Sequence, residues 1–151
     1  MTDEELRAVT RQTAEMLFGP PKRGEGAYQL WRKFDPELAR QMSMFYTGRL
    51  YAREVISQKQ RELCAVAALT VLQRLEELRL HIGAALNVGA TKEEVAEVIF
   101  QMMTYGGVPT TVEGLKVCKE VLVERGLWQE EGPDGPAPTQ SRQGPDGPAP
   151  T

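Results

Sequence analysis

The stretch RELCAVAALTVLQRLEELRLHIGAALNVG, residues 61–89, decides the fold class. Its first part, LCAVAALTVL, is an apolar run that follows Ser57 and Gln60, the pair expected of a helix-capping box. Such a run, in a chain without a membrane span, predicts a central helix that is contacted from all sides. The remainder predicts an amphipathic helix that contains His81, the only histidine, and ends before Gly89.

Helix start and stop signals continue on both sides of this stretch, and no segment shows the alternating pattern of a strand. The first helix is expected to end at the Gly-Pro-Pro of residues 19–21, and GAYQLWRKF predicts a short second helix. We therefore predict an all-α fold, a compact domain of six or seven helices joined by short turns. The other predicted boundaries are Thr2 and Glu5 for the first helix, Asp35, Pro36 and Tyr46 for the third, Thr91, Glu94 and Gly106-Gly107 for the helix after Gly89, and Pro109, Thr110, Glu113 and Gly126 for the last.

Composition divides the chain into one folded domain, expected over residues 1–130, and a tail over residues 131–151. The 151 residues are 41% hydrophobic, which is enough for one compact core. The tail contains GPDGPAPT twice, at 132–139 and 144–151. Because such sequence buries too little apolar surface to offset the entropy of ordering, we expect a disordered tail without a catalytic role.

The charge balance and the N-terminal sequence limit the classes of partner. With 18 Lys and Arg against 21 Asp and Glu, the net charge of -3 does not suggest binding to nucleic acid or to a membrane surface. The polar start MTDEELRAVT lacks the features of a signal peptide, and no apolar window reaches the ~18 residues of a membrane span. We therefore expect a cytoplasmic protein.

The two cysteines, Cys64 and Cys118, lie far apart in the sequence and form no CxxC motif. With a single histidine, they do not provide the ligand spacing of a zinc site, so we expect no metal and two reduced thiols. The apolar neighbours of both residues favour inert positions in the core.

Glu62 immediately precedes the apolar run and leaves two interpretations open. It is either a first-turn acid that stabilises the helix dipole with one edge in solvent, or a carboxyl group drawn into the margin of the core. In the second case burial would make it a useful acid or base. Cys64 lies two residues later, at ~100° per residue on nearly the opposite side, so the two residues do not form one local site.

His81 lies at the edge of the apolar stripe of its helix. Steps of ~100° per residue place Arg74, Glu77 and His81 in one polar seam, while Leu80 and Ala84 face a second contact such as a partner subunit. A histidine in such a seam is either a hydrogen-bonded structural residue or an acid-base group. In the second case Glu77 could stabilise the imidazolium and an arginine could hold a carboxylate substrate.

The segment TYGGVPTT, residues 104–111, also has two interpretations. Paired glycines before a helix leave backbone N–H groups available for an anion, with Tyr105 close by. The same residues are equally typical of an ordinary turn between helices.

Residues 61–117, from RELCAV through LRLHIGAAL and the KEEVAEVIF helix to TYGGVPTTVEGLKV, resemble the carboxymuconolactone decarboxylase family, which includes the alkylhydroperoxidase D-like proteins. The upstream segments PEL and GRLYAREVISQKQREL extend the resemblance to about residues 27–125. It implies an all-helical domain of the alkylhydroperoxidase D-like type that assembles into homotrimers or homohexamers, with active sites close to subunit contacts.

The resemblance also assigns positions within the site. In the alkylhydroperoxidase D branch, a CxxC pair acts with a glutamate and a histidine. Glu62 and His81 match the glutamate and the histidine, whereas Arg74 and Glu77 occupy the two cysteine positions. The redox pair is absent, and neither Cys64 nor Cys118 replaces it.

The chain therefore resembles the decarboxylase branch, which acts without a cofactor on a small lactone carboxylate in the breakdown of aromatic compounds. That resemblance implies His81 as proton donor or oxyanion partner and Glu62 as second acid-base group or as the group that orients His81. Arg74 and, more weakly, Tyr105 are the expected substrate-binding residues. Two alternatives remain open: a thiol peroxidase or reductase that uses Cys64, and a non-catalytic oligomeric binding protein of the same fold.

Overall fold

The computed structural model describes residues 1–20 and 26–129, so the predicted tail lies outside the described residues. Within those ranges the chain is all-α, as predicted, with no strand. The elements in chain order are α1 (Asp3–Phe18), α2 (Ala27–Phe34), α3 (Pro36–Ser43), the π-helix η1 (Met44–Tyr51), α4 (Gln58–Val71), α5 (Leu75–Asn87), α6 (Lys92–Gln101), α7 (Met103–Gly106) and α8 (Val108–Glu124).

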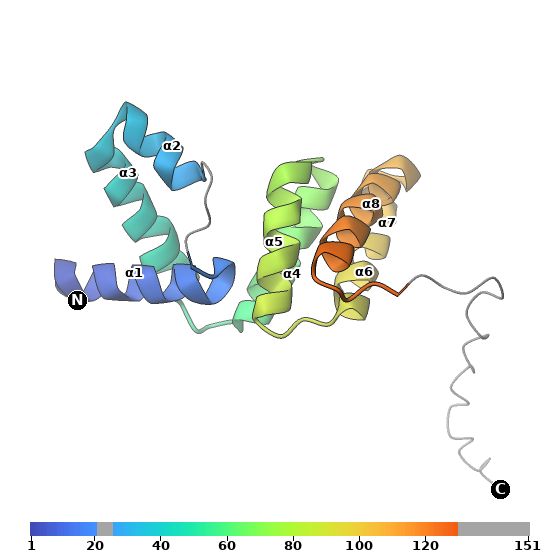
Figure 1. Ribbon diagram of the computed structural model, residues 1–151, viewed down its shortest axis with the longest axis horizontal. Helices are drawn as coiled ribbons and strands as arrows, with labels where there is room; N and C mark the ends of the chain where they lie inside the picture. Colours follow the sequence, from blue (N-terminus) through green and yellow to red (C-terminus); the bar gives the residue numbers. More distant parts are fainter. Residues whose placement is uncertain (21–25, 130–151) are drawn as a thin grey trace, which may run out of the picture.

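Helices α4 to α8 enclose the main core and stand together in Figure 1. Helix α4 packs against α5 and α6, and α8 packs against α5 and α6 from the other side. Apolar side chains that recur at helical spacing fill the space between these helices. No helix among the described residues is long and apolar enough to cross a membrane. The buried members of this core are Val66, Leu78, Ile82, Ala85, Ala90, Val95, Ile99, Val117, Cys118, Val121 and Leu122.

The three predicted capping boxes all form, which explains where α1, α4 and α6 begin. In each one the side chain of the first residue accepts from the backbone of the second, whose own side chain reaches back. Helix α8 starts at Val108 with Pro109 in its first turn, as predicted. Its N-cap is Gly107 at φ 85°, and neither Thr110 nor Glu113 provides a side-chain cap. The predicted helix from Thr91 to Gly106-Gly107 is interrupted at Met102, where α6 gives way to the single turn α7. The capping pairs are Thr2 with Glu5, Ser57 with Gln60, and Thr91 with Glu94.

Helix α4 is not contacted from all sides in the single chain, so that prediction was wrong. Glu62, Val66 and Thr70 are fully buried along one face, at the four-residue spacing of a helix stripe. The opposite face exposes Cys64 and Val71. The run is apolar throughout because alanines and leucines occupy both faces, a composition that does not show which face packs.

The N-terminal helices form a second packing unit in which α1 lies against η1 and α5. Gly48 permits the close approach of α1, because a Cβ atom there would overlap the Thr10 hydroxyl and touch Leu6. A small cluster of Leu17, Tyr51 and Ala84 then joins α1, η1 and α5. This contact brings the end of η1 next to the predicted site on α5.

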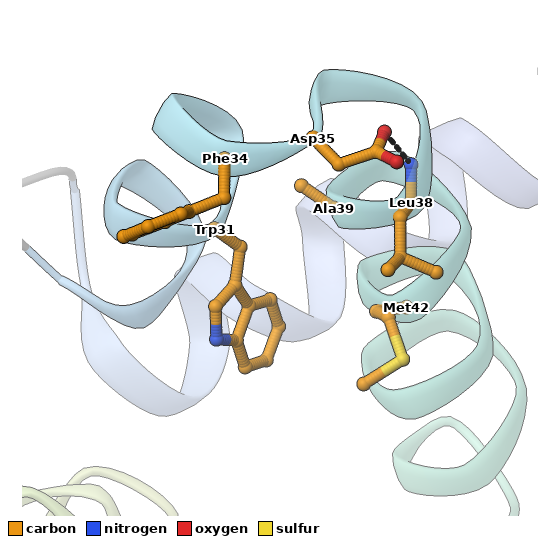
Figure 2. Close-up of a pocket in the computed structure, with 6 residues that line it drawn as sticks. All are labelled: Trp31, Phe34, Asp35, Leu38, Ala39 and Met42. Atoms are coloured by element: carbon orange, nitrogen blue, oxygen red, sulfur yellow. Dashed lines mark hydrogen bonds between the residues drawn. The ribbon is translucent and has the colours of Figure 1, made fainter.

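Helices α2 and α3 form a hairpin that stands at the opposite end from α8 in Figure 1. An Asp35 oxygen caps α3 by accepting from the Leu38 backbone N–H at 2.9 Å. Between the two helices lies a hollow of ≈ 320 Å³, and Figure 2 shows the side chains of α2 on one side of it and those of α3 on the other. The lining is apolar apart from Asp35, and most of it is exposed to solvent, including Phe34 at 85%. The lining residues are Trp31, Phe34, Asp35, Leu38, Ala39 and Met42.

Candidate active site

Glu62 of α4 and His81 of α5 form a buried hydrogen-bonded pair. The imidazole Nδ1 lies 2.7 Å from Glu62 Oε2, although nineteen residues separate the two in sequence. Glu62 is fully buried, and the His81 side chain is 11% exposed. The two helices that carry them are packed side by side in the core, so the pair is held by secondary structure rather than by loops.

The position of Glu62 decides between its two interpretations. Helix α4 begins at Gln58, so Glu62 is its fifth residue rather than a first-turn acid, and no edge of it reaches solvent. The dipole interpretation was therefore wrong. A carboxyl group without solvent contact must be compensated by hydrogen bonds, and His81 supplies one of them.

The hydrogen bond determines which imidazole nitrogen is available for chemistry. A carboxylate accepts only, so an ionised Glu62 places a proton on Nδ1. Nε2 makes no hydrogen bond to a described residue and is not among the fully buried unpaired atoms, so the exposed part of the ring includes it. Nε2 is therefore the atom that can meet a small molecule.

The surroundings of His81 are aromatic. The ring of Phe18 meets the imidazole edge-on, with centroids 5.9 Å apart. Tyr51 packs in the same small cluster as Ala84 of α5, and its hydroxyl accepts from Tyr46 at 3.3 Å. Burial raises the pKa of Tyr51, and the Tyr46 hydrogen bond and the charge of Glu62 act in the same direction. Tyr51 thus remains a neutral phenol beside the pair.

Three polar atoms on α4 are fully buried without a hydrogen-bond partner in the described chain: Gln58 Oε1, Arg61 Nε and Glu62 Oε1. The spacing of these residues places all three on one side of the helix. Buried polar atoms without partners are rare in folded proteins. Because three such atoms occur together beside the predicted site, a further polar group could supply the hydrogen bonds that they lack.

The polar seam predicted along α5 does not form. Gln73 has φ 54°, which breaks the helix, and α5 starts after Arg74 rather than running through it. Arg74 is exposed at the N-cap, about 10 Å from His81 along the axis at ~1.5 Å per residue. Glu77 is also exposed, and the partner of His81 is Glu62 instead.

Tyr105 lies on α7, 70% exposed, and this short helix packs on α4, α6 and α8. The structure therefore brings together Glu62 and His81 among the four predicted site residues, and places Arg74 and Tyr105 apart from them in the single chain. The turn at Gly107 carries no side-chain cap.

Comparison with known proteins places this site within a family. The family model described as the carboxymuconolactone decarboxylase family matches residues 36–120, more than half of the chain and the whole of α4 and α5. The chain belongs to the carboxymuconolactone decarboxylase family. Both members of the buried pair fall inside the matched range.

Three relatives illustrate the range of the carboxymuconolactone decarboxylase family around this chain. An uncharacterised 15.0 kDa protein of the nqo9-nqo10 intergenic region of Paracoccus denitrificans is 37% identical over 94 residues, 61% of this chain and 70% of the relative. The 4-carboxymuconolactone decarboxylase of Acinetobacter baylyi is 31% identical over 98 residues, covering 65% and 73%. The nitrosuccinic acid decarboxylase npaB of Metarhizium robertsii is 28% identical over 85 residues, covering 54% and 59%.

The cysteines of this family member were predicted to be core residues, which is correct only for Cys118. Cys118 is buried on α8, and burial raises the pKa of its thiol to about 11. Cys64 is exposed on the face of α4 opposite Glu62, so its predicted core position was wrong. No group of three or more His, Cys, Asp or Glu side chains in residues 1–20 and 26–129 is arranged to hold a metal.

Sequence reasoning did not assign a role to Tyr51, Arg61 or Phe18, although all three surround the pair. Phe18 reaches it through the packing of α1 on α5, and Tyr51 through the packing of η1 on α1, and neither long-range contact has a local sequence signal. Arg61 had a signal, because it directly precedes Glu62 in the REL motif.

Proposed function

We propose that this chain is a cofactor-independent decarboxylase of a small acid that carries at least two carboxylates, such as 4-carboxymuconolactone in the breakdown of aromatic compounds. The observation that carries the proposal is the buried Glu62–His81 pair in a member of this family. Two relatives named as decarboxylases, one for 4-carboxymuconolactone and one for nitrosuccinic acid, support it.

The two named substrates share a chemical feature that makes a cofactor unnecessary. In 4-carboxymuconolactone the departing carboxylate is attached to a saturated carbon that a C=C bond links to the lactone carbonyl, and in nitrosuccinic acid one carboxylate is attached to the carbon that bears the nitro group. When the C–C bond breaks and CO₂ leaves, the electron pair moves onto a carbonyl or nitro oxygen of the substrate itself. The protein then needs only to hold the acid, exclude water and return a proton to carbon.

His81 is suited to the return of that proton. In its protonated form, the Nε2–H donates to a carbon of the anion that CO₂ loss leaves behind, and the neutral ring takes up a proton from solvent afterwards. Glu62 accepts from Nδ1–H throughout, which fixes the ring and stabilises its positive charge. The edge of Phe18 and the buried Tyr51 limit water around the ring, and this strengthens both interactions.

The remaining parts of the proposal concern substrate contacts and assembly. Arg74 and Tyr105 stay predictions as substrate-binding residues, since both are exposed and lie apart from His81 in one chain. A homotrimer or homohexamer in the cytoplasm is likewise proposed. The exposed apolar hairpin of α2 and α3 supports a partner copy, because monomers seldom leave such a surface uncovered.

The test is CO₂ release by the purified chain from 4-carboxymuconolactone and from nitrosuccinate. In D₂O the product should carry deuterium on carbon, at the nitro-bearing carbon for nitrosuccinate and at a carbon of the former dienolate for the lactone. A parallel assay of peroxide consumption with a dithiol reductant, on the chain and on Cys64→Ser, separates the thiol alternative. Failure of both acids to decarboxylate faster than in buffer would contradict the proposal.

A further inference from the structure

The three unpaired buried atoms of α4 belong to side chains that converge on one residue of η1. Gln58 Nε2 donates to the Tyr51 carbonyl at 2.5 Å, and the guanidinium carbon of Arg61 lies 5.6 Å from the centre of the Tyr51 ring. Glu62, the residue after Arg61 on α4, is hydrogen-bonded to His81. Gln58, Arg61 and Glu62 therefore form one polar cluster on the side of α4 that meets Tyr51 of η1 and His81 of α5.

The donor and acceptor character of these atoms determines which chemical group can pair with this cluster. Arg61 Nε is a charged donor, and its Nη2 already donates to the Arg53 carbonyl at 3.0 Å, which fixes the guanidinium in place. Each buried polar atom without a partner costs about 1–3 kcal/mol, so a molecule that supplies the missing hydrogen bonds to this cluster would bind favourably. A carboxylate is the natural partner of a guanidinium N–H, while the oxygens of Gln58 and Glu62 accept from a water or an acid that accompanies it.

We propose that Arg61 binds the carboxylate that the substrate keeps, and thereby determines that the enzyme takes acids with a second carboxylate. The inference rests on the proposed decarboxylation and adds to it a residue that holds the carboxylate which the substrate keeps. A guanidinium on the departing carboxylate would stabilise the ground state and slow its loss. Arg61 and the Glu62–His81 pair are neighbours on one helix turn, so one carboxylate binds Arg61 while the reacting carbon meets His81.

The experiment uses succinate, an unreactive dicarboxylate, and its dimethyl ester, which carries no carboxylate, as probes of the full-length chain. Because His81 is the only histidine, its imidazole Hε1 gives a single NMR resonance that reports binding at this site. The wild type should bind succinate at least about tenfold more tightly than the ester, the value of one hydrogen bond to a charged group. Arg61→Gln should remove this preference, Arg61→Lys should retain part of it, and the exposed Arg49→Gln on η1 should leave it unchanged.

The ratio of the two affinities, rather than the affinity for succinate alone, distinguishes a lost carboxylate contact from a loss of folding. A variant that merely loosens the 52–57 segment weakens both probes equally, whereas loss of the carboxylate contact weakens only succinate. The proposal is overturned if the wild type shows no saturable shift, if Arg61→Gln keeps the preference, or if Arg61→Lys loses it as completely as Arg61→Gln. It is also overturned if Arg74→Gln removes the preference while Arg61→Gln does not.

The outcome is independent of turnover, because succinate is not decarboxylated. Arg61-dependent binding without CO₂ release from 4-carboxymuconolactone supports this site and contradicts the proposed reaction. CO₂ release with an unchanged succinate preference in Arg61→Gln supports the reaction and contradicts this site.

Discussion

Replacing Glu62 in two different ways tests whether this buried residue serves stability or chemistry. Glu62→Gln keeps the shape of the side chain and an oxygen that accepts from His81 Nδ1–H. Glu62→Ala removes the acceptor and leaves a cavity. We expect the glutamine variant to stay as stable as the wild type while losing activity, and the alanine variant to lose both.

The magnitudes follow from the burial of the pair. Glu62 is fully buried and one of its oxygens has no partner, so the charge is incompletely compensated. Replacing such a charged group with a neutral group of the same shape, as in Glu62→Gln, changes the free energy of unfolding by about 1 kcal/mol or less, in either direction. Removing one partner of a buried pair costs about 3–5 kcal/mol, a large part of the roughly 5–15 kcal/mol that stabilises a typical domain.

The assay is urea unfolding at one fixed protein concentration, followed by far-UV circular dichroism, with CO₂ release measured on the same preparations. In Glu62→Gln the loss of the charge beside the imidazolium should lower turnover by about 10². If Glu62→Gln destabilises as much as Glu62→Ala, the charge itself holds α4 to α5 and the reasoning is wrong. A cost below about 1 kcal/mol for Glu62→Ala would contradict the buried hydrogen bond.

Three further predictions concern packing, thiol chemistry and assembly. Gly48→Ala should destabilise by about 1–3 kcal/mol in urea unfolding, because the new Cβ meets Thr10 of α1. Iodoacetamide at pH 8 should modify Cys64 much faster than Cys118, whose thiol stays protonated below its raised pKa of about 11; equal rates by peptide mass spectrometry would contradict this. Phe34→Glu should reduce the oligomer measured by light scattering, with Arg49→Gln as the control.

Much of the fold could be predicted from sequence because its signals are local. Each capping box needs only two residues three positions apart, and the pairs at Thr2, Ser57 and Thr91 all form. The π-helix at Met44–Tyr51 was not predicted: the third helix was expected to end at about Tyr46, and the apolar spacing does not distinguish a π-helix from an α-helix. The exposed face of α4 was missed since an apolar run looks the same whichever side packs.

The site shows the same division between local and long-range information. The resemblance paired Glu62 with His81, and the 2.7 Å contact between them is present. Helical spacing alone chose Glu77 as the partner and placed Arg74 in the seam. This failed because Arg74 is the N-cap of α5, with non-helical backbone angles of φ -91° and ψ 76°, so helical spacing does not apply to it. Arg61 and Tyr51 emerged only once η1 was packed against α4.

The most direct test of the account is the turnover of 4-carboxymuconolactone by the wild type and by His81→Asn. Asparagine fills much of the space of histidine but donates no proton at neutral pH, so CO₂ release should fall by about 10² or more. The variant should still be folded by circular dichroism and should still bind succinate through Arg61, measured by calorimetry because the variant has no imidazole resonance. Turnover within experimental error of the wild type would contradict the role of His81 as the group that returns the proton.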